Sequence, residues 1–139
     1  MVKFKLAMGQ MLVEGGEVKK NLKRAIQFIQ QAAALGCKLV VLPECLDIGW
    51  TYPGAKELAQ PIPGKYSNQL CCAAKKSHIF VTAGLTERSK DESTPPENAT
   101  TALSIPEGIS QSFRNFFSAL LTIFLLEPQL RRLRLWCRL

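Results

Sequence analysis

Apolar and polar residues alternate at the start of the chain, where Val2, Phe4, Leu6 and Met8 are separated by Lys3, Lys5 and Ala7. A period of two residues is typical of a strand with one wetter face. After Gly15-Gly16 the period becomes helical, and the sequence predicts an amphipathic helix that ends near Gly36. Its apolar positions are Val18, Leu22, Ala25, Ile26, Ile29, Ala32 and Ala33, and its polar positions are Lys19, Lys20, Lys23, Arg24 and Gln27.

A short continuous apolar run, Leu39-Val40-Val41-Leu42, follows this helix. Such a run is typical of a parallel strand that is covered on both faces. Strand, helix and strand in this order predict a βαβ unit, with residues 2–8 and 38–42 in one sheet. The pattern therefore predicts an α/β fold.

The next segment, residues 45–66, is rich in proline and glycine and predicts a long loop with one short helix around Gly54 to Ala59. Connections of this length are usually functional. Trp50 and Tyr52 lie in it; we expect them to be packed aromatic residues, with the lining of a substrate pocket as the alternative.

Further along, Ser67 is the predicted cap of a helix that runs to Lys75. Residues 79–84 form a second buried apolar run and predict the next strand, which completes a second βα repeat. Residues 86–97 are polar and contain Pro95-Pro96, so a surface loop is expected there, with one more strand over residues 99–105.

Glu44 is the leading candidate for chemistry, because it directly follows Pro43 at the end of the predicted strand over residues 38–42. Ligand sites in α/β folds lie beyond the carboxyl ends of parallel strands. A carboxylate there can act as a general acid or base, and the apolar strand is expected to enclose it. The alternative is a loop carboxylate in a surface ion pair.

Composition limits the remaining possibilities. With 139 residues, of which 47% are hydrophobic, the chain fits one soluble globular domain. The net charge is +7, but residues 113–139 hold five basic and one acidic side chain, so no diffuse basic face for nucleic acid is expected. The five cysteines have no framework spacing and no secretory signal precedes them, which predicts reduced thiols in a cytoplasmic protein. No cofactor motif and no Cys/His metal cluster is present in the sequence, so neither group is predicted.

Taken together, these segments resemble the nitrilase superfamily of carbon-nitrogen hydrolases. The resemblance is carried by Leu6–Gln10, Asn21–Ala25, Ala33–Glu44 with its Val-Leu-Pro-Glu ending, Pro61–Gly64 and Ala83–Arg88. It implies a partial αββα sandwich, with residues 1–112 as the N-terminal part of a carbon-nitrogen hydrolase domain. Residues 113–139 do not match and form a divergent apolar and basic tail.

The resemblance also implies a Glu-Lys-Cys triad that hydrolyses amide or nitrile carbon-nitrogen bonds other than peptide bonds. Glu44 matches the glutamate, whose role would be that of the general base. The lysine position falls on Asn115 in Phe113-Arg114-Asn115, and Cys137, two residues from the end of the sequence, lacks the context of the nucleophile. Cys45, Cys71, Cys72 and His78 are interpreted as structural residues.

These observations leave three functions open. The first is a truncated carbon-nitrogen hydrolase that is inactive alone, with a small amide or nitrile as the family's substrate. The second is a non-catalytic fragment that pairs with a full-length relative or forms a homo-oligomer. The third is a peripheral membrane protein that uses its tail; the apolar residues 116–126 would span only about 16 Å as a helix, so a membrane crossing is not expected.

Overall fold

The computed structural model describes residues 5–88 and 97–104 of the chain. All of them belong to one unit, Met1–Ile105. The predicted tail over residues 113–139, including Asn115 and Cys137, lies outside the described residues. So does the predicted domain boundary after residue 112.

The described residues contain one four-stranded sheet in the order β1-β2-β3-β4. β1 (Leu6–Met8) and β2 (Leu39–Val41) are parallel, as are β2 and β3 (Phe80–Glu87), whereas β3 and β4 (Glu97–Ser104) are antiparallel. The helices are α1 (Val18–Ala34), α2 (Ala55–Leu58) and α3 (Lys65–Ser77). The predicted α/β class with βαβ units is confirmed.

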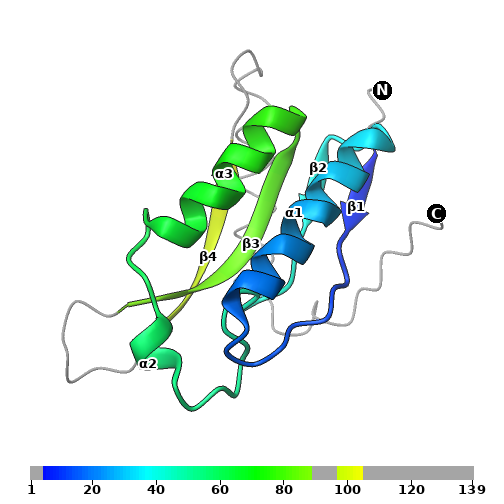
Figure 1. Cartoon of the computed structure of the whole chain (residues 1–139). Helices are drawn as coiled ribbons and strands as arrows, with labels where there is room; N and C mark the ends of the chain where they lie inside the picture. Colours follow the sequence, from blue (N-terminus) through cyan, green and yellow to red (C-terminus); the bar gives the residue numbers. More distant parts are fainter. Residues whose placement is uncertain (1–4, 89–96, 105–139) are drawn as a thin grey trace, which may run out of the picture. The chain divides into compact units, whose positions relative to one another are not determined.

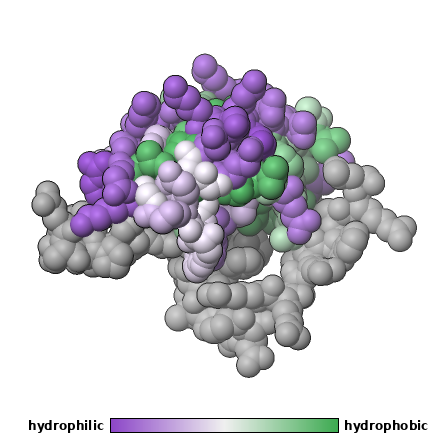
Figure 2. Space-filling model, turned by 60° about the horizontal axis from the view of Figure 1, so that its bottom comes forward, coloured by the Kyte–Doolittle hydropathy of each residue, from purple (hydrophilic) through white to green (hydrophobic). Residues whose placement is uncertain are grey.

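Helices α1 and α3 lie side by side on one face of the sheet (Figure 1). Between them and the sheet lies a core of buried aliphatic side chains that includes Leu22, Ile29, Val40, Leu70 and Val81. Leu39 and Phe80 are also buried but lie outside this cluster, because side chains alternate along a strand and these two point to the opposite face. The face of the described residues seen in Figure 2 is mainly hydrophilic, with hydrophobic residues visible between the polar ones.

Helix α1 occupies the predicted segment and ends before Gly36, whose φ of +74° suits glycine. The prediction for α3 is wrong in one detail. The helix begins at Lys65, with Gly64 as its capping residue, and Ser67 is the third helical residue. The Ser67 hydroxyl nevertheless caps the helix, because its oxygen accepts a hydrogen bond from the Gly64 N–H at 2.8 Å.

The strands also differ from the predicted ranges. β1 is shorter than predicted, since Lys5 lies outside it and residues 1–4 are not described. β3 continues three residues beyond Gly84, so Thr86 and Glu87 belong to a strand and not to the predicted loop. Pairing with β4 accounts for this extension, since Thr86 pairs with Asn98 and Glu87 with Glu97.

Candidate active site

Glu44 lies on a segment that continues alongside β3 after β2 has ended. The Leu42 N–H donates to Thr82 O at 2.9 Å, and the Leu46 N–H donates to Gly84 O at 3.0 Å. Between these two bonds, the Gly84 N–H donates to Pro43 O at 3.2 Å. Glu44 is therefore flanked on both sides by main-chain hydrogen bonds to Gly84, at the carboxyl end of β2.

The chain turns sharply at Cys45, which has a φ of +46° although it is not a glycine. The turn is closed by the Gly49 N–H, which donates to Cys45 O at 2.8 Å. The Cys45 side chain is buried while that of Glu44 is exposed, so the two neighbours face different surroundings, as predicted. Burial raises the pKa of the Cys45 thiol, which keeps it protonated and unreactive.

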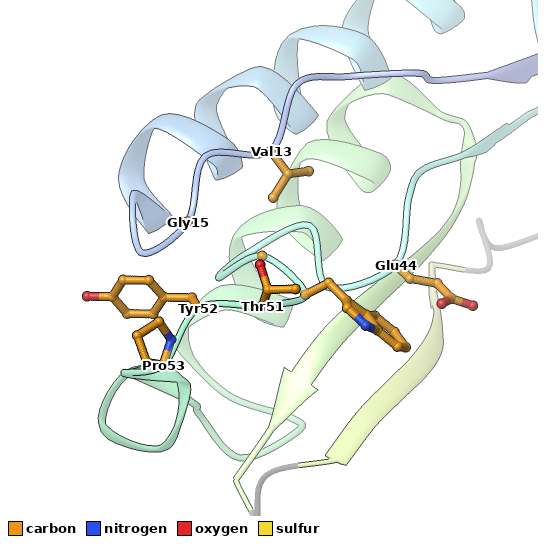
Figure 3. A pocket seen from close by; sticks show the side chains of 8 residues that line it. Val13, Gly15, Glu44, Thr51, Tyr52 and Pro53 are labelled. Carbon is orange, nitrogen blue, oxygen red and sulfur yellow. The ribbon is translucent and has the colours of Figure 1, made fainter.

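A hollow of about 390 Å³ lies beside Glu44 (Figure 3). Glu44 lies at one end of the row of labelled side chains, and Tyr52 and Pro53 lie at the other. Glu44 is the one charged residue among those that line the hollow, namely Val13, Gly15, Glu44, Gly49, Trp50, Thr51, Tyr52 and Pro53. The site is thus one carboxylate in an otherwise neutral, partly aromatic wall.

Two expectations about this wall are wrong. The apolar strand does not enclose Glu44, whose side chain is exposed. Trp50 is 69% exposed and is not a packed core aromatic. The ring of Tyr52 is partly packed against Gly15, Gly16 and Gly54, since a Cβ added to any of these glycines would contact it. The alternative, that Trp50 and Tyr52 line a pocket, fits the structure.

Asp47 was missed by the sequence reasoning, although it is the buried carboxylate of this region. Its exposed fraction is 0%. Its two carboxylate oxygens accept hydrogen bonds from the Thr86 N–H at 3.2 and 3.1 Å, and Oδ1 also accepts one from the Thr86 hydroxyl at 3.1 Å. Burial raises the pKa of the Asp47 carboxyl, and the bonds from Thr86 oppose that shift. An acid between apolar Leu46 and Ile48 was the available signal.

The side chain of Asn21 on α1 forms hydrogen bonds to both loops that line the hollow. Its Nδ2 donates to Glu14 O at 2.7 Å and to Asp47 O at 3.0 Å, and its Oδ1 accepts from the Glu14 N–H at 2.9 Å. Arg24 also donates to Asn21 Oδ1 and forms an ion pair with the Glu14 carboxylate. That hydrogen-bonded ion pair lowers the pKa of Glu14. The loop of Val13 and Gly15 is thereby tied to the loop of Glu44.

The other candidate residues lie elsewhere. His78 follows α3 in a left-handed conformation, with a φ of +51°. Cys71 is partly buried in α3 and Cys72 is exposed there. Within residues 5–88 and 97–104 no group of three or more His, Cys, Asp or Glu side chains could hold a metal ion. In the same residues, no helix combines the length and the apolar character needed to cross a membrane.

The parallel strands covered by α1 and α3, with Glu44 placed after β2, define an α/β protein of the kind that the resemblance implies. The profile of the carbon-nitrogen hydrolase family matches residues 5–114, so the chain belongs to that family. The predicted resemblance is confirmed for the N-terminal part of the family domain.

Individual relatives match a large part of the chain. The chain is 40% identical over 85 residues to omega-amidase NIT2 of Danio rerio, and the match covers 60% of this chain and 30% of the relative. It is 34% identical over 91 residues to a nitrilase of Pyrococcus abyssi, covering 63% of this chain and 35% of the relative. The chain therefore spans about a third of the length of these relatives.

Solved structures confirm the fold. The CN-hydrolase superfamily protein XC1258 from Xanthomonas campestris matches with a TM-score of 0.57 and 18% identity, over 65% of this chain and 33% of that one. The NitFhit protein of C. elegans matches with a TM-score of 0.53 and 21% identity, over 75% of this chain and 29% of that one.

Proposed function

We propose that this chain forms the part of a carbon-nitrogen hydrolase site that contains the glutamate. The site binds a small amide or nitrile. Glu44 acts there as the general base. The observation that supports this most is the position of Glu44, which lines the hollow at the carboxyl end of β2 and is flanked by hydrogen bonds to Gly84. The omega-amidase relatives favour a small linear amide as the ligand, and a cytoplasmic location is part of the proposal.

The chemistry follows from what a carboxylate at this place can do. A thiol attacks an amide carbon best as a thiolate, and a nearby carboxylate can accept its proton and later activate water against the thioester. The exposed Glu44 side chain is open to such a partner. The resemblance puts the lysine position on Asn115, and Cys137 lacks the context of the nucleophile, so we infer that the family's lysine and cysteine elements have no counterpart in residues 1–139. We therefore propose that the chain alone binds ligand weakly and does not turn it over.

Binding and hydrolysis are measured separately to test this proposal. The Trp136→Phe variant leaves Trp50, which lines the hollow, as the sole tryptophan reporter. We expect a small linear ω-amide to change Trp50 fluorescence saturably, and Glu44→Gln to weaken that response. Glu57→Gln is the matched control, because Glu57 is an exposed acid on α2 outside the hollow.

Two results would contradict the proposal. Identical responses of Glu44→Gln and the unsubstituted chain would remove Glu44 from the ligand site. Release of ammonia from linear amides or nitriles by the chain, lost in Glu44→Gln, would show that the chain has a complete catalytic site of its own.

A second candidate function is a non-catalytic subunit that pairs with a full-length relative. Among the strands that the structure describes, β1 lies at the edge of the sheet, and Met8 within it and Leu12 beyond it are 41% and 66% exposed. An edge strand with exposed apolar side chains is a typical pairing surface. Co-purification with an intact omega-amidase, reduced by a Met8→Lys substitution, would support this function, and separate elution of the two proteins would reject it.

A further inference from the structure

Asp47 is a buried carboxylate that takes no direct part in the chemistry proposed for Glu44. It is fully buried, and each of its oxygens accepts a hydrogen bond from Thr86. Burying an ionisable group is unfavourable unless hydrogen bonds compensate for the lost water. An alanine or leucine at this position would avoid that penalty, so the side chain points to a specific role.

The hydrogen bonds along β3 show which backbone acceptor the Asp47 carboxylate replaces. In a parallel ladder, alternate residues of one strand bond to the neighbour. Along β3 these residues are Thr82 and Gly84, which bond to the segment from Leu42 to Leu46, and the next one is Thr86. The main chain has turned away at Cys45, so the Asp47 side chain supplies the acceptor that a backbone carbonyl would otherwise provide.

The main chain of Asp47 is held independently from the other side. Its carbonyl oxygen accepts the hydrogen bond from Asn21 Nδ2, and the next carbonyl, that of Ile48, accepts one from the Gly16 N–H at 2.8 Å. Asp47 thus connects β3, through its side chain, to α1, through its backbone. The residues between these attachments and Pro43 include Glu44.

We propose that Asp47 is the positioning residue of Glu44. Its bonds to Thr86 and Asn21 hold the turn after Glu44 against β3, and this fixes the carboxylate and the neighbouring Trp50 at the hollow. The role assigned to Glu44 rests on the proposed function. The placement of Glu44 by Asp47 does not, and it can be measured without any substrate.

Three variants of the whole chain test the placement. Asp47→Asn keeps an oxygen for the Thr86 N–H and gains an amide that can donate to the Thr86 hydroxyl oxygen. Asp47→Ala leaves that N–H without an acceptor. Glu57→Ala removes an exposed acid elsewhere. We expect amide exchange at Leu46 and Thr86 to rise about tenfold in Asp47→Ala, and to stay unchanged in the other two.

A purely structural role is excluded by following Glu44 and Trp50 themselves. In Asp47→Ala we expect the carboxyl carbon signal of Glu44 and the Trp50 emission, in the Trp136→Phe background, to shift, while exchange at Val40 and Val81 in the core is unchanged. Asp47→Asn should restore both signals. Unshifted signals in Asp47→Ala, or an equal rise of exchange across the core, would overturn the proposal.

Thr86→Val provides the second test, and the decisive one should Asp47→Ala fail to fold. It removes the hydroxyl donor but keeps the Thr86 N–H and the side-chain shape. We expect smaller shifts of the Glu44 and Trp50 signals in the same direction, and no shift would reject the proposal. Shifted signals together with absent amide binding would reject the proposed function alone.

Discussion

Asn21 and Asp47 lie 26 residues apart in the chain, and the Asn21 Nδ2 donates to the Asp47 carbonyl oxygen at 3.0 Å. The same amide is bonded to the backbone of Glu14 through both its oxygen and its nitrogen. Both N–H groups of this buried side chain donate to the two loops beside the hollow, and its oxygen accepts from one of these loops and from Arg24 of α1. Asn21 on α1 therefore links the two loops that line the candidate site.

Asn21→Ala should destabilise the fold. The change leaves the Glu14 N–H and the Asp47 carbonyl without their partner, whereas the Glu14 carbonyl keeps the Glu17 N–H, and unsatisfied buried groups cost about 1–3 kcal/mol in the free energy of unfolding. Urea unfolding of both proteins measures the difference. Gln27→Ala on the exposed side of α1 is the control and should be near neutral. Equal stability of Asn21→Ala and Gln27→Ala would show that the network contributes nothing.

Asp47 should make stability depend on pH in a direction opposite to that of an ion-paired acid. Burial raises the pKa of its carboxyl in the folded chain above the ordinary value of 3.8, so the folded state binds the proton more tightly than the unfolded state. The stabilisation from Asp47 is therefore complete below about pH 3.8 and is lost as pH rises through the raised pKa.

The measurement is the free energy of unfolding of the unsubstituted chain minus that of Asp47→Asn, at several pH values from acid to neutral. Asparagine does not titrate, so the difference isolates the carboxyl of Asp47. We expect this difference in unfolding free energy to shift in favour of Asp47→Asn as pH rises, and then to level off. A difference that grows in favour of the unsubstituted chain would show that the Thr86 bonds outweigh the burial.

The sequence predicted the elements whose signal is local. Helix α1 has a clear 3.6-residue period and a glycine stop, and its bounds agree with the structure. Glu44 was placed correctly after β2, because a buried run that ends at proline is read from neighbouring residues alone. The role of Glu44 stays a prediction.

The rest depended on contacts between distant residues. The burial of Asp47 requires Thr86, which the sequence assigned to a loop because the polar residues after Gly84 gave no strand period. Pairing with β4, together with a bridge from Glu87 to Gln60, extends the strand that far. The exposure of Glu44 and of Trp50 was equally non-local, since it depends on which elements cover the loop, and not on the loop's own sequence.

Gly16 and Gly36 form a matched pair for separating backbone strain from crowding. Their φ angles are +76° and +74°, so alanine is strained to a similar degree at both, by about 1–2 kcal/mol. A Cβ at Gly36 meets nothing within 4 Å, whereas one at Gly16 would lie 2.6 Å from Cζ of Tyr52. We expect Gly16→Ala to lose more unfolding free energy than Gly36→Ala, and to shift the ring signals of Tyr52. An equal loss in both variants would mean that the ring moves aside freely.

Ser67→Ala should weaken the start of α3 although Ser67 is not its first residue. The hydroxyl accepts from the Gly64 N–H at 2.8 Å and donates to Gly64 O at 3.1 Å. Its removal therefore leaves the Gly64 N–H at the start of the helix without an acceptor. A loss of about 0.5–2 kcal/mol is expected, as for other capping side chains. Ser67→Thr, which keeps the hydroxyl, is the control. Since Leu70 and Ala74 anchor α3 in the core, amide exchange should increase at the first turn only, and an increase along the whole helix would contradict a capping role.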